Sequence, residues 1–184
     1  LYAIGATSGP YGAIYVFDEN LNILAKVRSG SPSVYYSLAY DGKALYIGGW
    51  AYEDVDGDGI EELIGLVEKR ALDESLSLVN SKKIYFGSWR GGGIWDIGVD
   101  PSTGRIWTVG HYFDSNGKEH SLIVILDSDL RELKVIAYPE GSEGYLGELK
   151  GIAFDGRYVY VSGQYGVAKF SADGELVAID KDYR

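Results

Sequence analysis

Short segments rich in β-branched and aromatic residues alternate along the whole chain with turns of Asp, Gly and Asn. No stretch keeps a helical hydrophobic period for three turns, so the pattern predicts an all-β protein. A motif of an aliphatic residue, an aromatic residue, two further residues and Gly occurs four times, at 1–5, 45–49, 106–110 and 159–163. Recurrence at intervals of this size is the signature of a repeat architecture.

The last three copies of the motif follow a strand-like segment that ends in Asp41, Asp100 or Asp155. Two further strands come after every copy, so the unit is a four-stranded antiparallel meander. The first unit lacks its inner strand, which gives units at roughly 1–28, 34–85, 94–138 and 149–180. Such sheets bury both faces only by packing against one another, so we predict one β-propeller domain over residues 1–184. A β-sandwich or barrel is the alternative.

The missing inner strand of the first unit leaves an open edge, because residues 180–184 are few for an added strand. Three explanations are open: a three-stranded blade, lost upstream sequence, or a strand supplied by another subunit. An unpaired edge is also a device for assembly.

The segment from Asp54 to Glu62 has the residue pattern of a calcium loop. Carboxylates stand at positions one, three and five, and Gly follows at position six, where the chain must wrap around the ion. An EF-hand needs Glu at position twelve, but Gly65 stands there and a strand-like run follows. The loop instead resembles the calcium loop of FG-GAP (integrin-type) propeller blades. The expected ligands of Ca²⁺ are Asp54, Asp56, Asp58, the carbonyl of Ile60, and Glu62; a solvated acidic turn is the alternative.

In a meander, the loops after the second strand emerge on the same side as the loops between units. The loops between units are rich in Gly and aromatics, and loops on a rigid scaffold commonly carry binding residues. Aromatic platforms with a few polar groups suit a sugar or a peptide side chain. We therefore predict a ligand face formed by Tyr35, Tyr36, Trp89, Arg90, Trp95, Asp96 and Tyr145. Packing between blades is the alternative for Tyr36 and Trp95.

The sequence predicts no catalytic residue. His111 and His120 flank a loop of the third unit, and Asp96 and Glu148 would have to meet across a channel mouth to act as a glycosidase pair. No serine-nucleophile elbow and no His-x-x-x-His pair is present.

The amino-acid composition excludes several classes of protein. The chain of 184 residues has no Cys, no Met and a net charge of −10, which excludes a disulfide scaffold, a thiol enzyme, a Cys-ligated metal centre and a basic nucleic-acid binder. The apolar run at 122–126 is too short to span a membrane. The Leu at position 1 is interpreted as the product of a cleaved signal peptide, and the scarcity of easily damaged residues suggests a thermophilic source.

Together these observations predict an extracellular or cell-surface, calcium-stabilised structural protein. It would self-assemble as a homo-oligomer or filament through its incomplete blade. The alternatives are a carbohydrate-binding or carbohydrate-active propeller and a fragment of a larger propeller.

Overall fold

The computed structural model describes the backbone of residues 2–6 and all atoms of residues 11–85 and 91–181. These residues form fifteen strands in four antiparallel sheets of three, four, four and four strands. The first sheet consists of β1 (Tyr2–Ala6), β2 (Gly12–Phe17) and β3 (Ile23–Arg28). The second consists of β4 (Ser33–Tyr40), β5 (Ala44–Glu53), β6 (Glu62–Ala71) and β7 (Leu78–Ile84). The third consists of β8 (Gly92–Val99), β9 (Ile106–Phe113), β10 (Glu119–Leu126) and β11 (Glu132–Pro139). The fourth consists of β12 (Leu149–Phe154), β13 (Tyr158–Gly163), β14 (Gly166–Ser171) and β15 (Leu176–Lys181).

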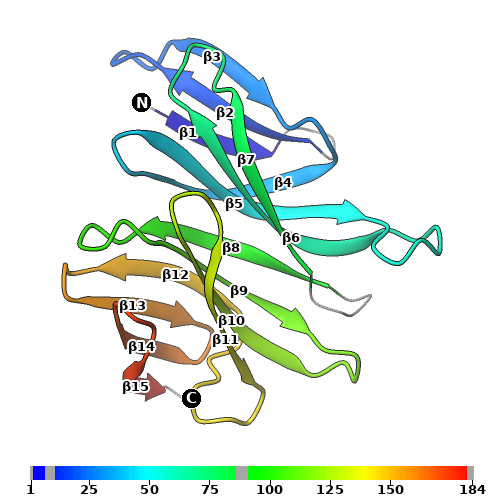
Figure 1. Cartoon of the computed structure of the whole chain (residues 1–184), viewed down its shortest axis with the longest axis vertical. Helices are drawn as coiled ribbons and strands as arrows, with labels where there is room; N and C mark the ends of the chain where they lie inside the picture. Colours follow the sequence, from blue (N-terminus) through cyan, green and yellow to red (C-terminus); the bar gives the residue numbers. More distant parts are fainter. Residues whose placement is uncertain (1, 7–10, 86–90, 182–184) are drawn as a thin grey trace.

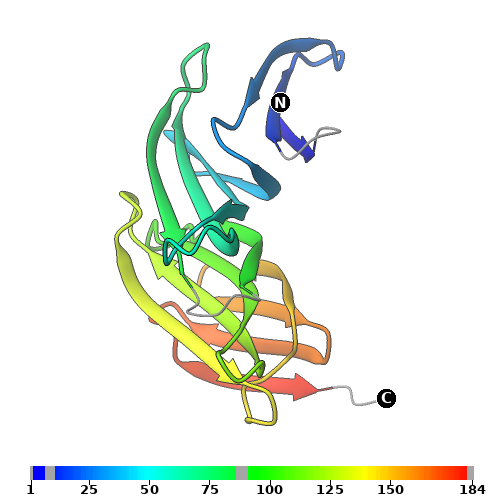
Figure 2. The same cartoon turned by 90° about the vertical axis from the view of Figure 1, so that its right-hand side faces the viewer.

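Each sheet pairs its strands in chain order, so every sheet is a meander. The sheets follow one another in space as they do in sequence, and the first and fourth lie at opposite ends of a curved array (Figures 1 and 2). The all-β prediction is therefore confirmed, and the first sheet has three strands, as expected from its missing inner strand. Closure of the sheets into a ring stays a prediction.

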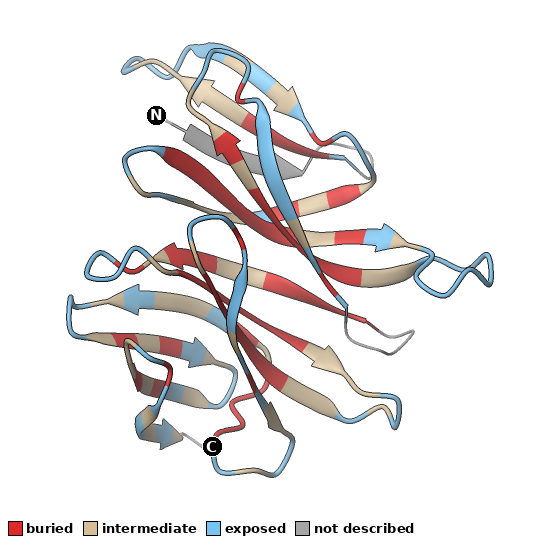
Figure 3. Cartoon of the chain, in the orientation of Figure 1, coloured by how far each residue is buried: buried red, intermediate tan, exposed pale blue. Residues whose placement is uncertain are grey.

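The core consists of three apolar layers, one between each pair of consecutive sheets (Figure 3). Ile14 of the first sheet packs with Leu45 and Ile47 of the second. Tyr46 of the second sheet shares a cluster with Ile94 and Leu122 of the third. Alternate residues of a strand point to opposite faces, so one sheet contributes to two layers. The fourth sheet and the third meet through a further cluster that contains Trp107, Val161 and Phe170.

The hairpin before the last strand has the same turn in every sheet. In three sheets an Asp side chain closes the turn: Asp18 Oδ1 accepts the backbone N–H of Asn22, Asp73 that of Ser77, and Asp127 that of Arg131. Three residues after each Asp comes a leucine with positive φ, namely Leu21 (64°), Leu76 (47°) and Leu130 (63°). The fourth sheet has Gly174 at this place, with φ of 77°. A leucine in this conformation is strained and a glycine is not, so we expect the leucine side chain to make packing contacts that offset the strain.

A β-bulge interrupts the inner strand of the second, third and fourth sheets at equivalent positions. The pairing shifts between Tyr35 and Ser37, between Ile94 and Asp96, and between Leu149 and Gly151. The bulge brings the inner backbone close to the glycine that ends the sequence motif. A β-carbon at Gly49 would overlap the carbonyl oxygen of Val34, and one at Gly110 that of Gly93. In the second and third sheets the glycine of the motif is thus explained by the bulge.

Candidate functional site

The three bulges leave one extra residue on each inner strand, and these residues gather in one column. They are Tyr36, Trp95 and Lys150. The ring centroids of Tyr36 and Trp95 lie 4.4 Å apart, and the Lys150 ammonium lies 5.0 Å from the centroid of Trp95. Tyr36 is 41% exposed. The bulges therefore build a contact surface across three sheets, with an aromatic centre and a cation at one end.

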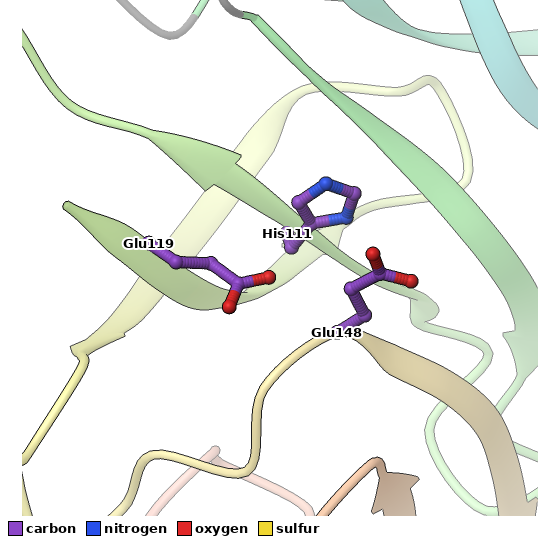
Figure 4. Close-up of side chains that lie close together, drawn as sticks. All are labelled: His111, Glu119 and Glu148. Atoms are coloured by element: carbon purple, nitrogen blue, oxygen red, sulfur yellow. The ribbon is translucent and has the colours of Figure 1, made fainter. Parts of the chain in front are cut away.

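A histidine and two glutamates meet beside this column (Figure 4). His111 lies on β9, Glu119 begins β10, and Glu148 comes from the loop before β12. One nitrogen of His111 and one oxygen of each carboxylate all lie within 4.8 Å of one another. His111 is only 9% exposed, and the glutamates are half-buried. Figure 4 shows the carboxyl groups of Glu119 and Glu148 close to the imidazole ring of His111.

Each member of this His111–Glu119–Glu148 cluster has a further partner. The indole N–H of Trp95 donates to His111 Nδ1 over 2.9 Å. The Tyr145 hydroxyl donates to Glu119 Oε2 over 2.5 Å, and Lys150 Nζ lies 2.8 Å from Glu148 Oε2. The cluster is thus joined directly to the column at Trp95 and Lys150.

Burial and charge set the protonation of this region. Burial lowers the pKa of His111 below 6.5, and Lys150 lowers it further, although the charges of Glu148 and Glu119 oppose both effects. Burial also raises the pKa of Tyr145, and its hydrogen bond to Glu119 raises it further. Near neutral pH the site therefore offers a neutral imidazole and a protonated phenol beside two glutamates.

The structure separates the predicted ligand residues into groups. Tyr36, Trp95 and Tyr145 lie at the column and cluster. Tyr35 is only 3% exposed and its hydroxyl donates to Glu68, so its position does not support a ligand-binding role. Trp89 and Arg90 lie outside the described residues.

Asp96 makes contacts between strands that the sequence did not reveal. Its Oδ1 accepts the Ser37 hydroxyl over 2.5 Å and its Oδ2 accepts the Ile152 backbone N–H over 2.9 Å. One carboxylate therefore ties the inner strands of three sheets together. Asp96 is thus a structural link between these strands, and its part in a ligand face stays a prediction.

The sequence did not single out Glu119, Lys150 or the meeting of His111 with both glutamates. The available signal was the repeated glycine of the motif. Each of these glycines pairs with the residue just before a bulge on the inner strand: Gly49 with Tyr35, Gly110 with Ile94 and Gly163 with Leu149. The next residue along each inner strand is the bulged one, namely Tyr36, Trp95 or Lys150.

The predicted calcium loop forms a tight, exposed turn between β5 and β6. Asp54 accepts the backbone N–H groups of Gly57 and Gly59 over 2.7 and 3.0 Å, and both glycines have positive φ. One oxygen from each of Asp54, Asp56 and Asp58 lies within 4.8 Å of the others. Glu62 Oε2 instead accepts the Val55 N–H, and Ile60 is 63% exposed. Three of the five predicted ligands thus converge before any ion binds.

No family model matches the chain, and no curated protein resembles it in sequence. Among the described residues no helix is long and apolar enough to cross a membrane.

Proposed function

We propose that this protein self-associates through the outer face of its first sheet, as a calcium-stabilised β-propeller module whose ring is completed by another copy of the chain. The supporting observation is the position of Leu21. Leu76 and Leu130 occupy the same place in the turns of the second and third sheets. Those two are 2% and 4% exposed and pack against the preceding sheet, whereas Leu21 is 66% exposed.

The neighbours of Leu21 extend this apolar surface. Ile23 is 59% exposed and Leu24 is 66% exposed. Exposed apolar side chains close together are typical of an association surface. Leu78 and Val79, the equivalent residues of the second sheet, are also exposed, at 52% and 57%, so Leu21 is the position that distinguishes the first sheet. The first sheet also ends at β1, which pairs only with β2 among the described strands. A second copy could therefore add to both the face and the edge of this sheet.

The outer face of the fourth sheet contrasts with this surface. Val159 and Val161 pack against the third sheet, so Tyr158 and Tyr160 point the other way. Lys169 lies 3.7 Å from the ring centroid of Tyr158 and 5.7 Å from that of Tyr160. A charged, aromatic outer face suits a terminal repeat. This asymmetry favours association through the first sheet.

Sedimentation velocity over a concentration series tests the proposal. We expect concentration-dependent association that Leu21→Glu abolishes, because the charge would have to be buried. Leu133→Glu is the control, since Leu133 is 52% exposed on β11, and it should leave association unchanged. Monomers at the highest attainable concentration would disprove the proposal. The extracellular location and thermophilic source stay predictions from the sequence.

A second candidate function is binding of a carbohydrate at the column of Tyr36, Trp95 and Lys150. The supporting observation is a partly exposed aromatic stack beside hydrogen-bonding carboxylates, which suits the apolar face and hydroxyl edge of a sugar ring. Titration with an oligosaccharide panel should change tryptophan fluorescence, and Trp95→Ala should remove the binding measured by calorimetry. Tyr40→Ala is the control, because Tyr40 is 54% exposed at the other end of β4. A panel that produces no binding rules this candidate out.

The loop of Asp54, Asp56 and Asp58 is the proposed calcium site, supported by the convergence of the three carboxylates. At a calcium concentration about 100 times Kd, binding to the folded state should add about 2.7 kcal/mol to stability. Thermal unfolding with and without chelator measures this gain. Asp56→Asn should remove it and Asp180→Asn should keep it. A wild-type melting temperature that is the same with and without chelator would contradict calcium binding.

A further inference from the structure

We propose that His111, Glu119 and Glu148 form a second cation site, which binds a divalent transition-metal ion such as Zn²⁺. This inference is independent of self-association and of the calcium loop. Its basis is one imidazole nitrogen and two carboxylate oxygens within 4.8 Å of one another, supplied by β9, β10 and the loop before β12. Imidazole nitrogen and carboxylate oxygen both bind zinc in proteins, and they occur together in His- and Glu-ligated zinc sites.

The distances require only a small closure of the site. Zinc binds these donors at about 2.0–2.2 Å, which places donors of one tetrahedral ion about 3.3 Å apart. Glu119 and Glu148 are half-buried and lie at a strand end and in a loop, so their side chains have room to move inward. His111 is held on β9 and is only 9% exposed, so it is the fixed member of the set.

The surrounding side chains provide the outer contacts that metal ligands usually have. Tyr145 holds Glu119, and Lys150 holds Glu148. Hydrogen-bonded carboxylates orient toward an ion and lose less freedom when they bind it. The two carboxylates and Lys150 carry a combined formal charge of −1, so a divalent cation is attracted to the site.

Trp95 competes with the ion for His111. The indole N–H donates to Nδ1, so in the ion-free protein the Nδ1 lone pair is used and the imidazole proton is on Nε2. A metal on Nδ1 must displace the indole N–H. A metal on Nε2 needs the lone pair of that nitrogen, so the imidazole proton moves to Nδ1, which can then no longer accept from the indole. Either way, ion binding disturbs the Trp95 hydrogen bond, and removal of that bond should strengthen metal binding.

The ligand set also predicts which ion each site selects. The Asp54–Asp56–Asp58 loop offers only oxygen, which suits Ca²⁺, whereas an imidazole nitrogen favours zinc and its neighbours in the first transition row. The two sites should therefore fill independently when both ions are present.

Titration of chelator-treated protein with ZnCl₂ tests the proposal by calorimetry and by tryptophan fluorescence. We expect one bound ion and a fluorescence change as the indole loses its partner. Glu119→Gln and Glu148→Gln should each weaken binding about tenfold or more, and His111→Gln should abolish it. Trp95→Phe should bind zinc more tightly than the wild type.

His120→Gln is the matched control, because His120 contacts Asp114 and not the cluster. It should bind zinc like the wild type, and so should Asp56→Asn, which alters only the calcium loop. Far-ultraviolet circular dichroism identifies any variant that fails to fold. Glu148 is half-buried and lies in a loop, so Glu148→Gln has the smallest risk of misfolding. The proposal is overturned if wild-type protein takes up no zinc, or if zinc uptake is unchanged in folded Glu119→Gln and Glu148→Gln.

Discussion

Leu21 and Leu130 occupy the same place in two turns of this protein but have different surroundings. Both have φ near 64° (64° and 63°), a conformation that costs a bulky L-residue about 1–2 kcal/mol. Leu130 is 4% exposed in the layer between the second and third sheets, and this burial offsets the strain. Leu21 is 66% exposed, so its side chain gains little burial from the described part of the chain to offset this strain. The comparison shows that the same turn leucine is exposed in the first sheet and buried in the third.

The two layers that cover Leu76 and Leu130 are also built differently. The layer around Leu130 is a cluster of apolar side chains. The layer around Leu76 contains a charged network, in which Arg70 lies 2.7 Å from Glu68 and donates to the Leu76 carbonyl oxygen. The Tyr35 hydroxyl donates to the same Glu68 oxygen. The second sheet therefore holds a buried polar network beside the apolar cluster through which it packs against the first sheet.

The largest expected effect comes from breaking this network. Glu68→Ala leaves the Arg70 guanidinium buried without its carboxylate, and the side chains of Arg70 and Glu68 are 6% and 8% exposed. Loss of one partner of a buried ion pair costs about 3–5 kcal/mol of unfolding free energy. Chemical denaturation measures the loss, with Glu74→Ala in the exposed turn as the control. A loss below about 1 kcal/mol would show that solvent reaches Arg70.

Leu130→Ala tests the apolar layer in the same way. Deletion of a buried leucine side chain costs about 2–5 kcal/mol because transfer energy and packing are both lost. The positive φ remains strained with Ala, so no relief offsets the cost. Denaturant unfolding of Leu130→Ala beside Leu133→Ala gives the comparison, since Leu133 is 52% exposed. Equal stability of the two variants would mean that Leu130 does not hold the second and third sheets together.

The strands and turns could be predicted from the sequence because local chemistry fixes them. Asp41 and Asp155 accept backbone N–H groups two and three residues ahead, so Asp before a turn marks a strand end wherever it occurs. The candidate site could be predicted only in part, at Tyr36, Trp95 and Tyr145, because the way its residues come together depends on register. A bulge shifts the pairing by one residue at Tyr36, which places Tyr35 in the core and leaves Tyr36 exposed. Glu148 reaches His111 only because the fourth sheet packs beside the third.

Leu21→Gly addresses the open face directly and should have the opposite sign. Glycine removes the strain of positive φ and, in the monomer, exposed Leu21 has little packing to lose. We expect a gain of about 1 kcal/mol in unfolding free energy at low protein concentration. The same change should weaken self-association at high concentration, because the leucine side chain is missing from the contact. A variant that is destabilised at every concentration would show that Leu21 already packs within the chain.

The smallest expected effect concerns the aspartates that close these turns. In Asp73, hydrogen bonds from the side chain and backbone of Ser77 lower the pKa from 3.8 to about 2. The unfolded chain therefore takes up this proton at higher pH than the folded protein does. The stabilisation is complete above pH 3.8 and is lost as the pH falls toward about 2. The pKa of Asp18 is lowered in the same direction by hydrogen bonds from the side chain and backbone of Asn22.

Thermal unfolding measured from pH 5 down to about pH 2 tests this linkage. Asp73→Asn should unfold at a lower temperature than the wild type near pH 5, and the difference should shrink as the pH approaches 2. Asp18→Asn should behave in the same way although its turn lies on the open sheet, because the aspartate acts within its own hairpin. If only Asp73→Asn changes the acid dependence, the turn of the first sheet is not stabilised by its own aspartate. The two turns would then differ in more than the burial of their leucines.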